Sequence, residues 1–385
     1  MPEAVIVDAI RTPIGRAFKG SLKDVRADEL AAVPLKALQE RNPEVDFGQT
    51  DDLYMGAASG IGEQGYNVAR NALLLSGIDH HVPAATVNRF CASSLQTMRM
   101  AYHAVAAGEG DQYIAAGVEA VSRAGLGAGI PDEVKNPKLD GSEGSLFDVY
   151  IPMGLTAENV AERCRVSREA QDEWAVTSQN RAVDAQQSGH FDAEITPVET
   201  PDGTMTKDDG PRPGTTMEVL GDLEPAFKEE GTVTAGNSCP LNDGAAAVLI
   251  MAADRAEQLG VTPKARIIAA SAAAIRPEIM GLGPIPAVEK VLRQAGMTMD
   301  DIDVVELNEA FAAQVVPCRE EWGIDADRLN PFGGAIALGH PFGMTGARIM
   351  TTLLNDLGTL DKTIGLETMC VAGGMGQAMI VERLN

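Results

Sequence analysis

The same succession of strand-like and helix-like segments occurs twice in this chain, at an offset of 252 residues. Residues 51–58, 90–98 and 112–117 align at this offset with residues 303–310, 342–350 and 364–369. In both copies, short apolar runs typical of buried strands alternate with stretches of helical periodicity. Because one offset relates three pairs of segments, the sequence indicates an internal duplication. A repeated βαβ order predicts an α/β fold with a mixed, mostly parallel sheet and helices packed on it.

Residues 120–241 interrupt the repeated order. Glycine, proline and aspartate are frequent at 125–144 and 201–214. Two helices are expected between these stretches, the first capped by Thr156 and the second over 167–189. An insertion of this length inside a compact protein usually covers or forms a functional site.

The charge and hydropathy of the chain limit its partners and its location. The 385 residues carry a formal net charge of −24, which argues against a nucleic-acid partner. No run of about 18 apolar residues is present, so we expect no membrane span. The first residues lack a charged region followed by a long apolar core, which predicts a cytoplasmic protein rather than a secreted one.

The five cysteines show no paired close spacing, which favours neither a zinc site nor a disulfide framework. Cys91 is the strongest candidate for chemistry, because a predicted strand ends and a helix begins there. Free backbone N–H groups and the helix dipole at such a junction favour a thiolate. The alternative is a small apolar residue packed at the junction. Its position alone does not separate these two interpretations.

Four further residues allow both a chemical and a structural interpretation. His340 lies in a glycine-rich loop and could move a thiol proton, or could be a structural loop histidine. Cys370 follows a predicted strand and precedes a glycine-rich turn. It could donate and accept a proton, or could be a buried residue at the strand end. Asn308 could orient a water, or could cap a helix that begins there. Arg212 could meet a phosphate or a base edge, or could be a solvated loop charge.

These motifs become specific in combination. They are VNRFCASSLQ (87–96), NEAFA (308–312), GGAIALGHPFG (333–343) and TMCVAGGMG (368–376), in this order. The combination resembles the thiolase family of 3-ketoacyl-CoA thiolases and acetyl-CoA acetyltransferases, over essentially the whole chain. The resemblance implies a duplicated thiolase fold, with two βαβαβαββ halves packed as a five-layered αβαβα core and an inserted loop domain. The expected parts are an N-terminal half (1–119 plus 242–264), the loop domain (120–241) and a C-terminal half (265–385).

The resemblance also implies a role for each candidate. The cysteine that matches Cys91 carries the acyl group, and the histidine that matches His340 activates it. The cysteine that matches Cys370 is the acid and base at the α-carbon of the substrate. The asparagine that matches Asn308 holds a water that forms one oxyanion hole with His340. Backbone N–H groups matching Cys91 and Ala372 form the other, although many relatives have glycine in place of Ala372.

Coenzyme A is the co-substrate that the resemblance implies, with no permanently bound cofactor and no metal. Met153 and Phe311 match positions that line the pantetheine tunnel, and Arg212 matches one near the adenine. Ser238 and Cys239 replace the small residues usual after TAGN, and a serine is common at the position of Cys239. Family members are usually dimers or tetramers, so a homo-oligomer is expected, with 125–144 where a tetramerisation loop lies.

The direction of the reaction depends on fewer residues. Pro152 stands where acetoacetyl-CoA-forming members often have histidine, and Arg89 also resembles degradative members. We therefore expect thiolysis of 3-ketoacyl-CoA in fatty acid β-oxidation, with ping-pong kinetics. The alternatives are a biosynthetic acetyl-CoA acetyltransferase that forms acetoacetyl-CoA, a β-ketoacyl synthase, and a non-catalytic acyl-CoA or lipid binding protein. The last would have lost Cys91, His340 or Cys370, and all three are present.

Overall fold

The computed structural model describes residues 2–124 and 132–385, and most of its strands belong to one ten-stranded sheet. Along the sheet the order is β10-β11-β12-β9-β1-β8-β5-β3-β4, and the short β2 pairs with β8. These strands are β1 (Ala4–Arg11), β2 (Gly15–Arg16), β3 (Asp52–Gly56), β4 (Ala84–Val87), β5 (Gln112–Ala120), β8 (Asn242–Ala252), β9 (Ala265–Ala274), β10 (Val304–Leu307), β11 (Ile364–Val371) and β12 (Met375–Arg383).

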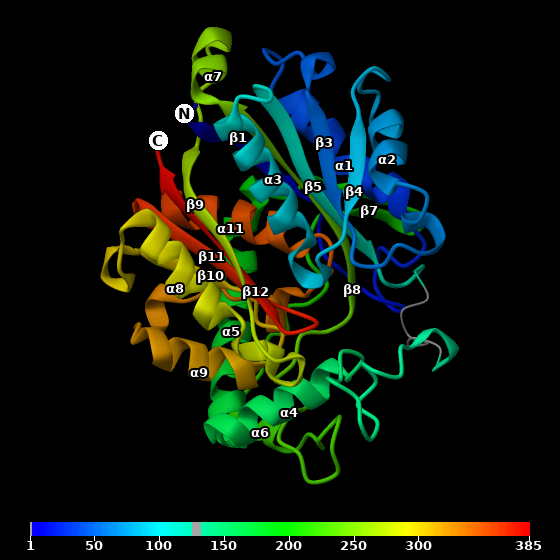
Figure 1. Cartoon of the computed structure of the whole chain (residues 1–385), viewed down its shortest axis with the longest axis vertical. Coiled ribbons are helices and arrows are strands. Elements are labelled where there is room, and N and C mark those ends of the chain that lie inside the picture. Colours follow the sequence, from blue (N-terminus) through cyan, green and yellow to red (C-terminus); the bar gives the residue numbers. More distant parts are fainter. Residues whose placement is uncertain (1, 125–131) are drawn as a thin grey trace.

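Helices cover both faces of this sheet (Figure 1). They are α1 (Ala27–Arg41), α2 (Val68–Ser76), α3 (Ser93–Ala107), α4 (Met153–Cys164), α5 (Arg168–Ser188), α6 (Met217–Gly221), α7 (Ala253–Leu259), α8 (Pro284–Ala295), α9 (Ala312–Trp322), α10 (Ala335–Leu338) and α11 (Thr345–Thr359). A separate hairpin joins β6 (Val198–Thr200) to β7 (Gly203–Met205). In the part of the chain described, no helix is both long and apolar enough to cross a membrane.

The internal duplication is confirmed by the positions of these elements. The elements α3, β3 and β5 begin 252 residues before α11, β10 and β11, which is the offset read from the sequence. The order β3-β5-β8-β1 on one side of the sheet also corresponds to β10-β11-β12-β9 on the other. The two half-sheets meet where β1 pairs with β9 through only two residue pairs.

The prediction of a mostly parallel sheet is wrong. Only β3–β4, β3–β5 and β10–β11 pair in parallel, and the remaining pairs are antiparallel. The βαβ order accounts for the parallel pairs, because a helix carries the chain back to the same end of the sheet. The tight turn from β11 to β12 permits only an antiparallel pair, and β8 enters beside β5 after the insertion without such a crossover.

The core has five layers, as expected from the αβαβα arrangement. One apolar cluster packs α1 and α2 against the outer face of the first half-sheet, and another packs α8 and α9 against the second. A third cluster lies between the two half-sheets and contains the buried faces of α3 and α11. These two helices approach closely at Gly346, where a Cβ would overlap the backbone of Leu95. The central layer therefore fixes the distance between the halves.

The inserted segment supplies α4, α5 and α6, the green elements at the lower end of Figure 1. Ser167 caps α5 by accepting a hydrogen bond from the N–H of Ala170, and Gly189 ends it, as predicted. The prediction that Thr156 caps α4 is wrong. The helix begins at Met153, and the Thr156 hydroxyl donates to the Met153 carbonyl at 2.6 Å instead. The reason is that the carbonyl of Pro152 already starts the helical hydrogen bonding.

Candidate active site

Cys91 lies in a 3₁₀ turn (Phe90–Ala92) between β4 and α3. Phe90 adopts a left-handed backbone conformation, with φ of 47°, and this bend turns the chain sharply just before the cysteine. Only 9% of Cys91 is exposed. The residue therefore lies at the predicted junction between strand and helix, in a short turn that ends just before the α-helix begins at Ser93.

Burial dominates the acidity of the Cys91 thiol and raises its pKa to about 12. The backbone N–H groups of Ala372 and Cys91 itself oppose this effect but do not reverse it. The expectation that the helix start favours a thiolate is therefore wrong for the resting protein, because desolvation outweighs the hydrogen bonds from these N–H groups. An internal base must remove the proton of Cys91 when a substrate binds.

His340 follows the short helix α10 on a loop that two contacts hold in place. Gly339 has a φ of 113°, and a Cβ there would lie 2.6 Å from the Asn242 side chain. That side chain in turn accepts a hydrogen bond from the backbone N–H of His340 at 2.9 Å. Gly339 is thus required both for its conformation and for this close approach. The result is a fully buried imidazole on a rigid backbone.

The hydrogen bonds of His340 assign its tautomer. Its Nδ1 lies 2.7 Å from the Thr345 hydroxyl, and this hydroxyl donates its only proton to the Pro341 carbonyl. Nδ1 must therefore carry a proton and donate it to Thr345, which leaves Nε2 as the free base. Burial lowers the pKa of His340 to about 3, so the ring is neutral at physiological pH. A neutral imidazole with a free Nε2 can accept a thiol proton.

Asn308 lies directly after β10 and faces this nitrogen. Its Nδ2 is 3.3 Å from Nε2 of His340, and its own backbone N–H donates to the Thr368 carbonyl. The interpretation of Asn308 as a helix cap is wrong, because α9 begins only at Ala312. Its side-chain oxygen is buried and lacks a hydrogen-bond partner among the described residues. This oxygen is free to bind a water or a substrate group.

Cys370 and Ala372 lie at the tip of the β11–β12 hairpin, drawn in red in Figure 1. Cys370 lies inside β11 and not after it, because the pairing with β12 continues to Val371. Its thiol is fully buried and donates a hydrogen bond to Oε1 of Gln314 at 2.9 Å. Burial raises the pKa of this thiol well above its usual value, and negative charge on Cys91 raises it further. A charge on one thiol therefore opposes a charge on the other.

Four of the predicted residues share one apolar cluster. Met153, Cys239 and Phe311 pack in it together with Cys370. The backbone of Cys239 donates to the Ala310 carbonyl at 3.0 Å, and its thiol has a raised pKa because of burial and of charge on Cys91. The structure thus brings predicted coenzyme-binding residues beside the two thiols.

Ser238 and Arg212, the two remaining residues predicted to bind coenzyme A, line one small hollow. Ser238 forms a bridge with Phe311, and its hydroxyl donates to the Thr234 carbonyl. Arg212 is exposed, and it lines this hollow together with Ser238. Its backbone N–H donates to the side chain of Gln179 at 2.9 Å.

Four polar residues of the site were missed by the sequence interpretation. They are Glu119, Asn242, Gln314 and Thr345. Glu119 is buried at the end of β5, and its carboxylate accepts from the N–H of Gly343 at 2.8 Å, which ties the first half to the histidine loop. Gln314 and Thr345 lie two residues after the end of the NEAFA and GHPFG motifs, and this proximity was the available signal.

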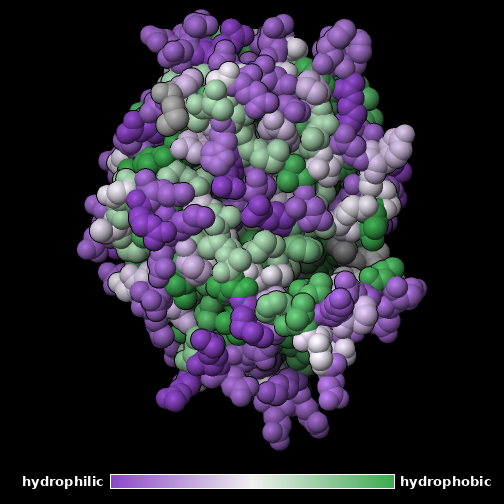
Figure 2. Space-filling model, viewed as in Figure 1, coloured by the Kyte–Doolittle hydropathy of each residue, from purple (hydrophilic) through white to green (hydrophobic). Residues whose placement is uncertain are grey.

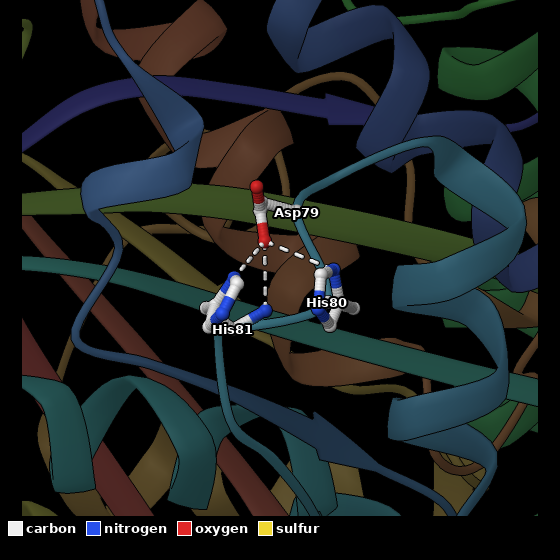
Figure 3. Close-up of side chains that lie close together, drawn as sticks. All are labelled: Asp79, His80 and His81. Carbon is white, nitrogen blue, oxygen red and sulfur yellow. Dashed lines mark hydrogen bonds and ion pairs between the residues drawn. The ribbon is translucent and has the colours of Figure 1, made fainter.

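The predicted site residues can be compared with groups of side chains that could hold a metal. Within the described residues, one group of potential ligands lies close together, formed by Asp79, His80 and His81 (Figure 3). All three are exposed, and the Asp79 carboxylate is hydrogen-bonded to the backbone N–H and the ring of His81. The group lies on the turn between α2 and β4, away from the thiols.

Comparison with known proteins decides the family. Residues 4–254 match the family model "Thiolase, N-terminal domain", and residues 261–383 match "Thiolase, C-terminal domain". The chain belongs to the thiolase family. It is therefore an acyltransferase, as the motifs predicted. The thiolase fold is confirmed as well, since the layers and the duplication match the expectation.

Relatives of this thiolase cover it from end to end. A beta-ketoadipyl-CoA thiolase of Pseudomonas aeruginosa is 47% identical and covers 99% of each chain. A 3-ketoacyl-CoA thiolase of Aeromonas hydrophila is 45% identical over 100% of both chains. The crystal structure of the Bacillus anthracis acetyl-CoA acetyltransferase superposes with a TM-score of 0.91 at 36% identity, over 100% of this chain and 99% of that one. The first two names share the thiolase activity and differ in the acyl group, and the third names an acetyl transfer from acetyl-CoA.

Proposed function

We propose that this thiolase cleaves 3-ketoacyl-CoA with coenzyme A into acetyl-CoA and a shortened acyl-CoA. The observation that carries the proposal is a pair of buried thiols, Cys91 and Cys370, close enough for charge on the first to raise the pKa of the second, in a fold that also buries the neutral imidazole of His340. Cys91 comes from the first half, and His340 and Cys370 come from the second. One thiol can carry an acyl group while the other transfers a proton, which the two half-reactions require.

The first half-reaction begins when Nε2 of His340 takes the proton of Cys91. The sulfur then attacks the keto carbon, and the N–H groups of Cys91 and Ala372 stabilise the oxyanion. Each such donor is worth about 3 kcal/mol in a transition state. The carbon–carbon bond breaks, and its electron pair becomes the enolate of acetyl-CoA. The thioester oxygen of the enolate is stabilised by the protonated His340 and by a water on Asn308, and Cys370 protonates the α-carbon.

The second half-reaction returns every proton. The Cys370 thiolate takes the proton of the incoming coenzyme A thiol, and the new thiolate attacks the acyl group on Cys91. Cys91 leaves as a thiolate and regains its proton from His340. Because the acyl group stays on the protein between the two steps, we expect ping-pong kinetics.

Coenzyme A acts here as a co-substrate, and we propose no permanently bound cofactor. We propose that Met153, Phe311 and Cys239 line the pantetheine path, with Ser238 beside it and Arg212 near the adenine. The apolar cluster that the first three share with Cys370 supports this path. We also keep the division into two halves and a loop domain at 120–241. Its support is that β5 and β8, which bracket the loop domain, are direct neighbours in the sheet.

We propose a wider range of substrates than those of β-oxidation, and we keep both directions of the reaction as candidates. Relatives are named for beta-ketoadipyl-CoA as well as for 3-ketoacyl-CoA, so a carboxylated acyl chain is a second candidate substrate. Synthesis of acetoacetyl-CoA by the reverse reaction is the alternative, and the named acetyl-CoA acetyltransferase supports it. Rates of thiolysis across short, long and dicarboxylic 3-ketoacyl-CoAs, including 3-oxoadipyl-CoA, distinguish these substrates.

We further propose a cytoplasmic homo-oligomer, a dimer or a tetramer. All five cysteines are free, which is typical of a reducing compartment. The strand β4 lies at the edge of the sheet with its residues half-exposed, and Tyr66 nearby is 97% exposed. Such an edge is commonly covered by a partner. The predicted tetramerisation loop at 125–144 lies partly outside the described residues. Sedimentation velocity tests the oligomer.

Mass spectrometry tests the mechanism directly. After incubation with acetyl-CoA or a 3-ketoacyl-CoA and digestion, we expect one acyl group on the peptide that contains Cys91. An acyl group on another residue, or full activity of Cys91→Ala, contradicts the mechanism.

A further inference from the structure

Gln314 contacts Cys370 in a way that no sequence motif assigned. The residue lies in the first turn of α9 and is fully buried. Its Oε1 accepts the hydrogen bond of the Cys370 thiol at 2.9 Å. The other end of the same amide, Nε2, is also buried and has no hydrogen-bond partner among the described residues. An unpaired buried N–H group is costly, so a role for it is expected.

The surroundings hold the Gln314 side chain against the thiol. A Cβ at Gly281 would lie 2.9 Å from Cβ of Gln314, so the glycine at this position makes room for the glutamine. Cys318 lies one turn later on α9, and its thiol points to the Gly281 carbonyl at 3.8 Å. The other titratable groups that act on Cys370 are the thiols of Cys91, Cys318 and Cys239, all of them neutral when buried. Gln314 is therefore the polar partner available to Cys370.

The proposed reaction requires two protonation states of Cys370. It must be a thiol when the enolate forms, and a thiolate when coenzyme A arrives. A hydrogen bond that accepts from the thiol stabilises the neutral form, whereas one that donates to the sulfur stabilises the anion. A primary amide offers both, because its carbonyl accepts and its NH₂ group donates. Rotation of the amide by half a turn exchanges them, and the unpaired Nε2 means that this rotation breaks no other hydrogen bond.

We propose that Gln314 is a positioning residue for Cys370, whose amide accepts from the thiol and, after rotation, donates to the thiolate. This inference rests on the proposed function, because it assigns Gln314 to the proton-transfer step of that reaction. The alternative is that Gln314 only fills space between α9 and the residues around Gly281. The two differ in whether proton transfer by Cys370 depends on the amide more strongly than acylation of Cys91 does.

The test compares two rates in each variant. The first is deuterium incorporation at the α-carbon of acetyl-CoA in heavy water, which requires Cys370. The second is acylation of Cys91 by 4-nitrothiophenyl acetate, whose thiolate leaves without a proton, so that only the proton of Cys91 has to move, to His340. In Gln314→Met, which keeps the volume, we expect deuterium incorporation to fall about tenfold or more, because a buried polar partner is lost. Acylation of Cys91 should change less than about threefold.

A matched control comes from the inserted segment. Gln171 is likewise a fully buried glutamine with one side-chain hydrogen-bonding group paired and one atom unpaired, and its Nε2 donates to the Thr232 hydroxyl at 2.9 Å. We expect Gln171→Met to leave the ratio of the two rates at its wild-type value. If Gln314→Met lowers both rates by the same factor, or neither, the amide only packs and the inference is wrong.

Gln314→Glu gives a second readout through its pH profile. While protonated, the introduced carboxyl can accept from the thiol and donate to the thiolate, so deuterium incorporation should recover at low pH. Once ionised, it can only accept and repels the thiolate, so incorporation should fall as pH rises. A profile parallel to the wild type contradicts the inference, and this variant decides the question if Gln314→Met does not fold. Absence of an acyl group on Cys91 in the wild type would instead contradict the proposed function.

Discussion

The two halves of this thiolase share a backbone plan but differ in what they bury. At the offset of 252 residues, the first half has Asn88 and Val118 where the second has His340 and Cys370. The difference extends beyond the site. Three buried acids of the second half, Glu306, Asp356 and Glu367, correspond to Tyr54, Ala104 and Ala115. In the proposed mechanism, the first half therefore contributes the nucleophile, and the second contributes the groups that move protons together with these three buried acids.

This contrast indicates that the same backbone arrangement can bury different sets of side chains in the two halves. In the second half, Glu306 and Glu367 are directly opposite each other on β10 and β11, and Arg348 on α11 lies 4.0 Å from Glu306. Burial raises the pKa of Glu306, Asp356 and Glu367 well above the usual range. The equivalent strands β3 and β5 bury no such cluster. Substitutions that exchange counterparts between the halves can therefore test which differences serve the reaction and which serve only the fold.

The largest effect is expected from the residue that the first half contributes. Cys91→Ala removes the nucleophile, so thiolysis should fall by a factor of about 10⁴ or more. Steady-state assay of coenzyme A consumption measures this loss, and the melting temperature should stay close to the wild-type value. Residual activity above one per cent would show that another group can carry the acyl chain.

His340→Asn gives the second half the residue found at the same position of the first, Asn88. Loss of the base should lower kcat about 10²–10³-fold. The variant should also change the pH dependence of stability. Because the folded pKa of about 3 lies below that of an unfolded histidine, wild-type stability falls as pH decreases below about 6.5. Urea unfolding at pH 7.5 and pH 5.5 should show a smaller fall in the variant, and an equal fall would mean that His340 is not buried neutral.

Gly346→Ala tests the contact between the two equivalent helices. The added methyl group would overlap the backbone of Leu95 and force α3 and α11 apart, at a cost of about 1–3 kcal/mol. The counterpart, Ser94, already carries a side chain, and its hydroxyl accepts from the N–H of Ala347 at 2.9 Å. Calorimetry should give a melting temperature several degrees lower. An unchanged melting temperature would mean that the helices separate freely.

Glu367→Gln is expected to have the smallest effect, and of the opposite sign. Both carboxylate oxygens of Glu367 are buried without a partner among the described residues. Since its folded pKa is raised, the folded state keeps a proton that the unfolded state releases, and stability falls as pH rises above about 4.5. The variant lacks this penalty and should gain on the order of 1 kcal/mol at pH 8. At pH 4 the two proteins should be equal, and a gain independent of pH would point to packing instead.

The sequence predicted the parts of the molecule that repeat or that carry motifs. The offset of 252 residues predicted the separation between α3 and α11, although both helices begin two residues later than the sequence indicated. Strand direction was not predictable in this way. Whether β8 runs parallel or antiparallel to β5 depends on how an insertion of over a hundred residues returns the chain, which local periodicity does not record.

The proposed reactive groups stand in sequence motifs, whereas their contacts do not. Cys91, His340 and Cys370 lie in motifs, but Gln314 and Glu119 meet them through contacts between distant segments. Burial also overturned a local argument, because desolvation of Cys91 outweighs the hydrogen bonds from backbone N–H groups at the helix start. The pKa of a thiol depends on all the groups packed around it, whereas the local sequence shows only its neighbours along the chain.

The narrow junction between β1 and β9 has a mechanical consequence. Two residue pairs join the half-sheets there, and the packed helices α3 and α11 hold the rest of the boundary. In the proposed mechanism the reacting groups lie on opposite sides of this boundary. Relative movement of the two halves would therefore separate the nucleophile from the base while each half keeps its own strands. A bound molecule that contacts both halves would oppose this movement. Heating should therefore abolish activity before secondary structure is lost.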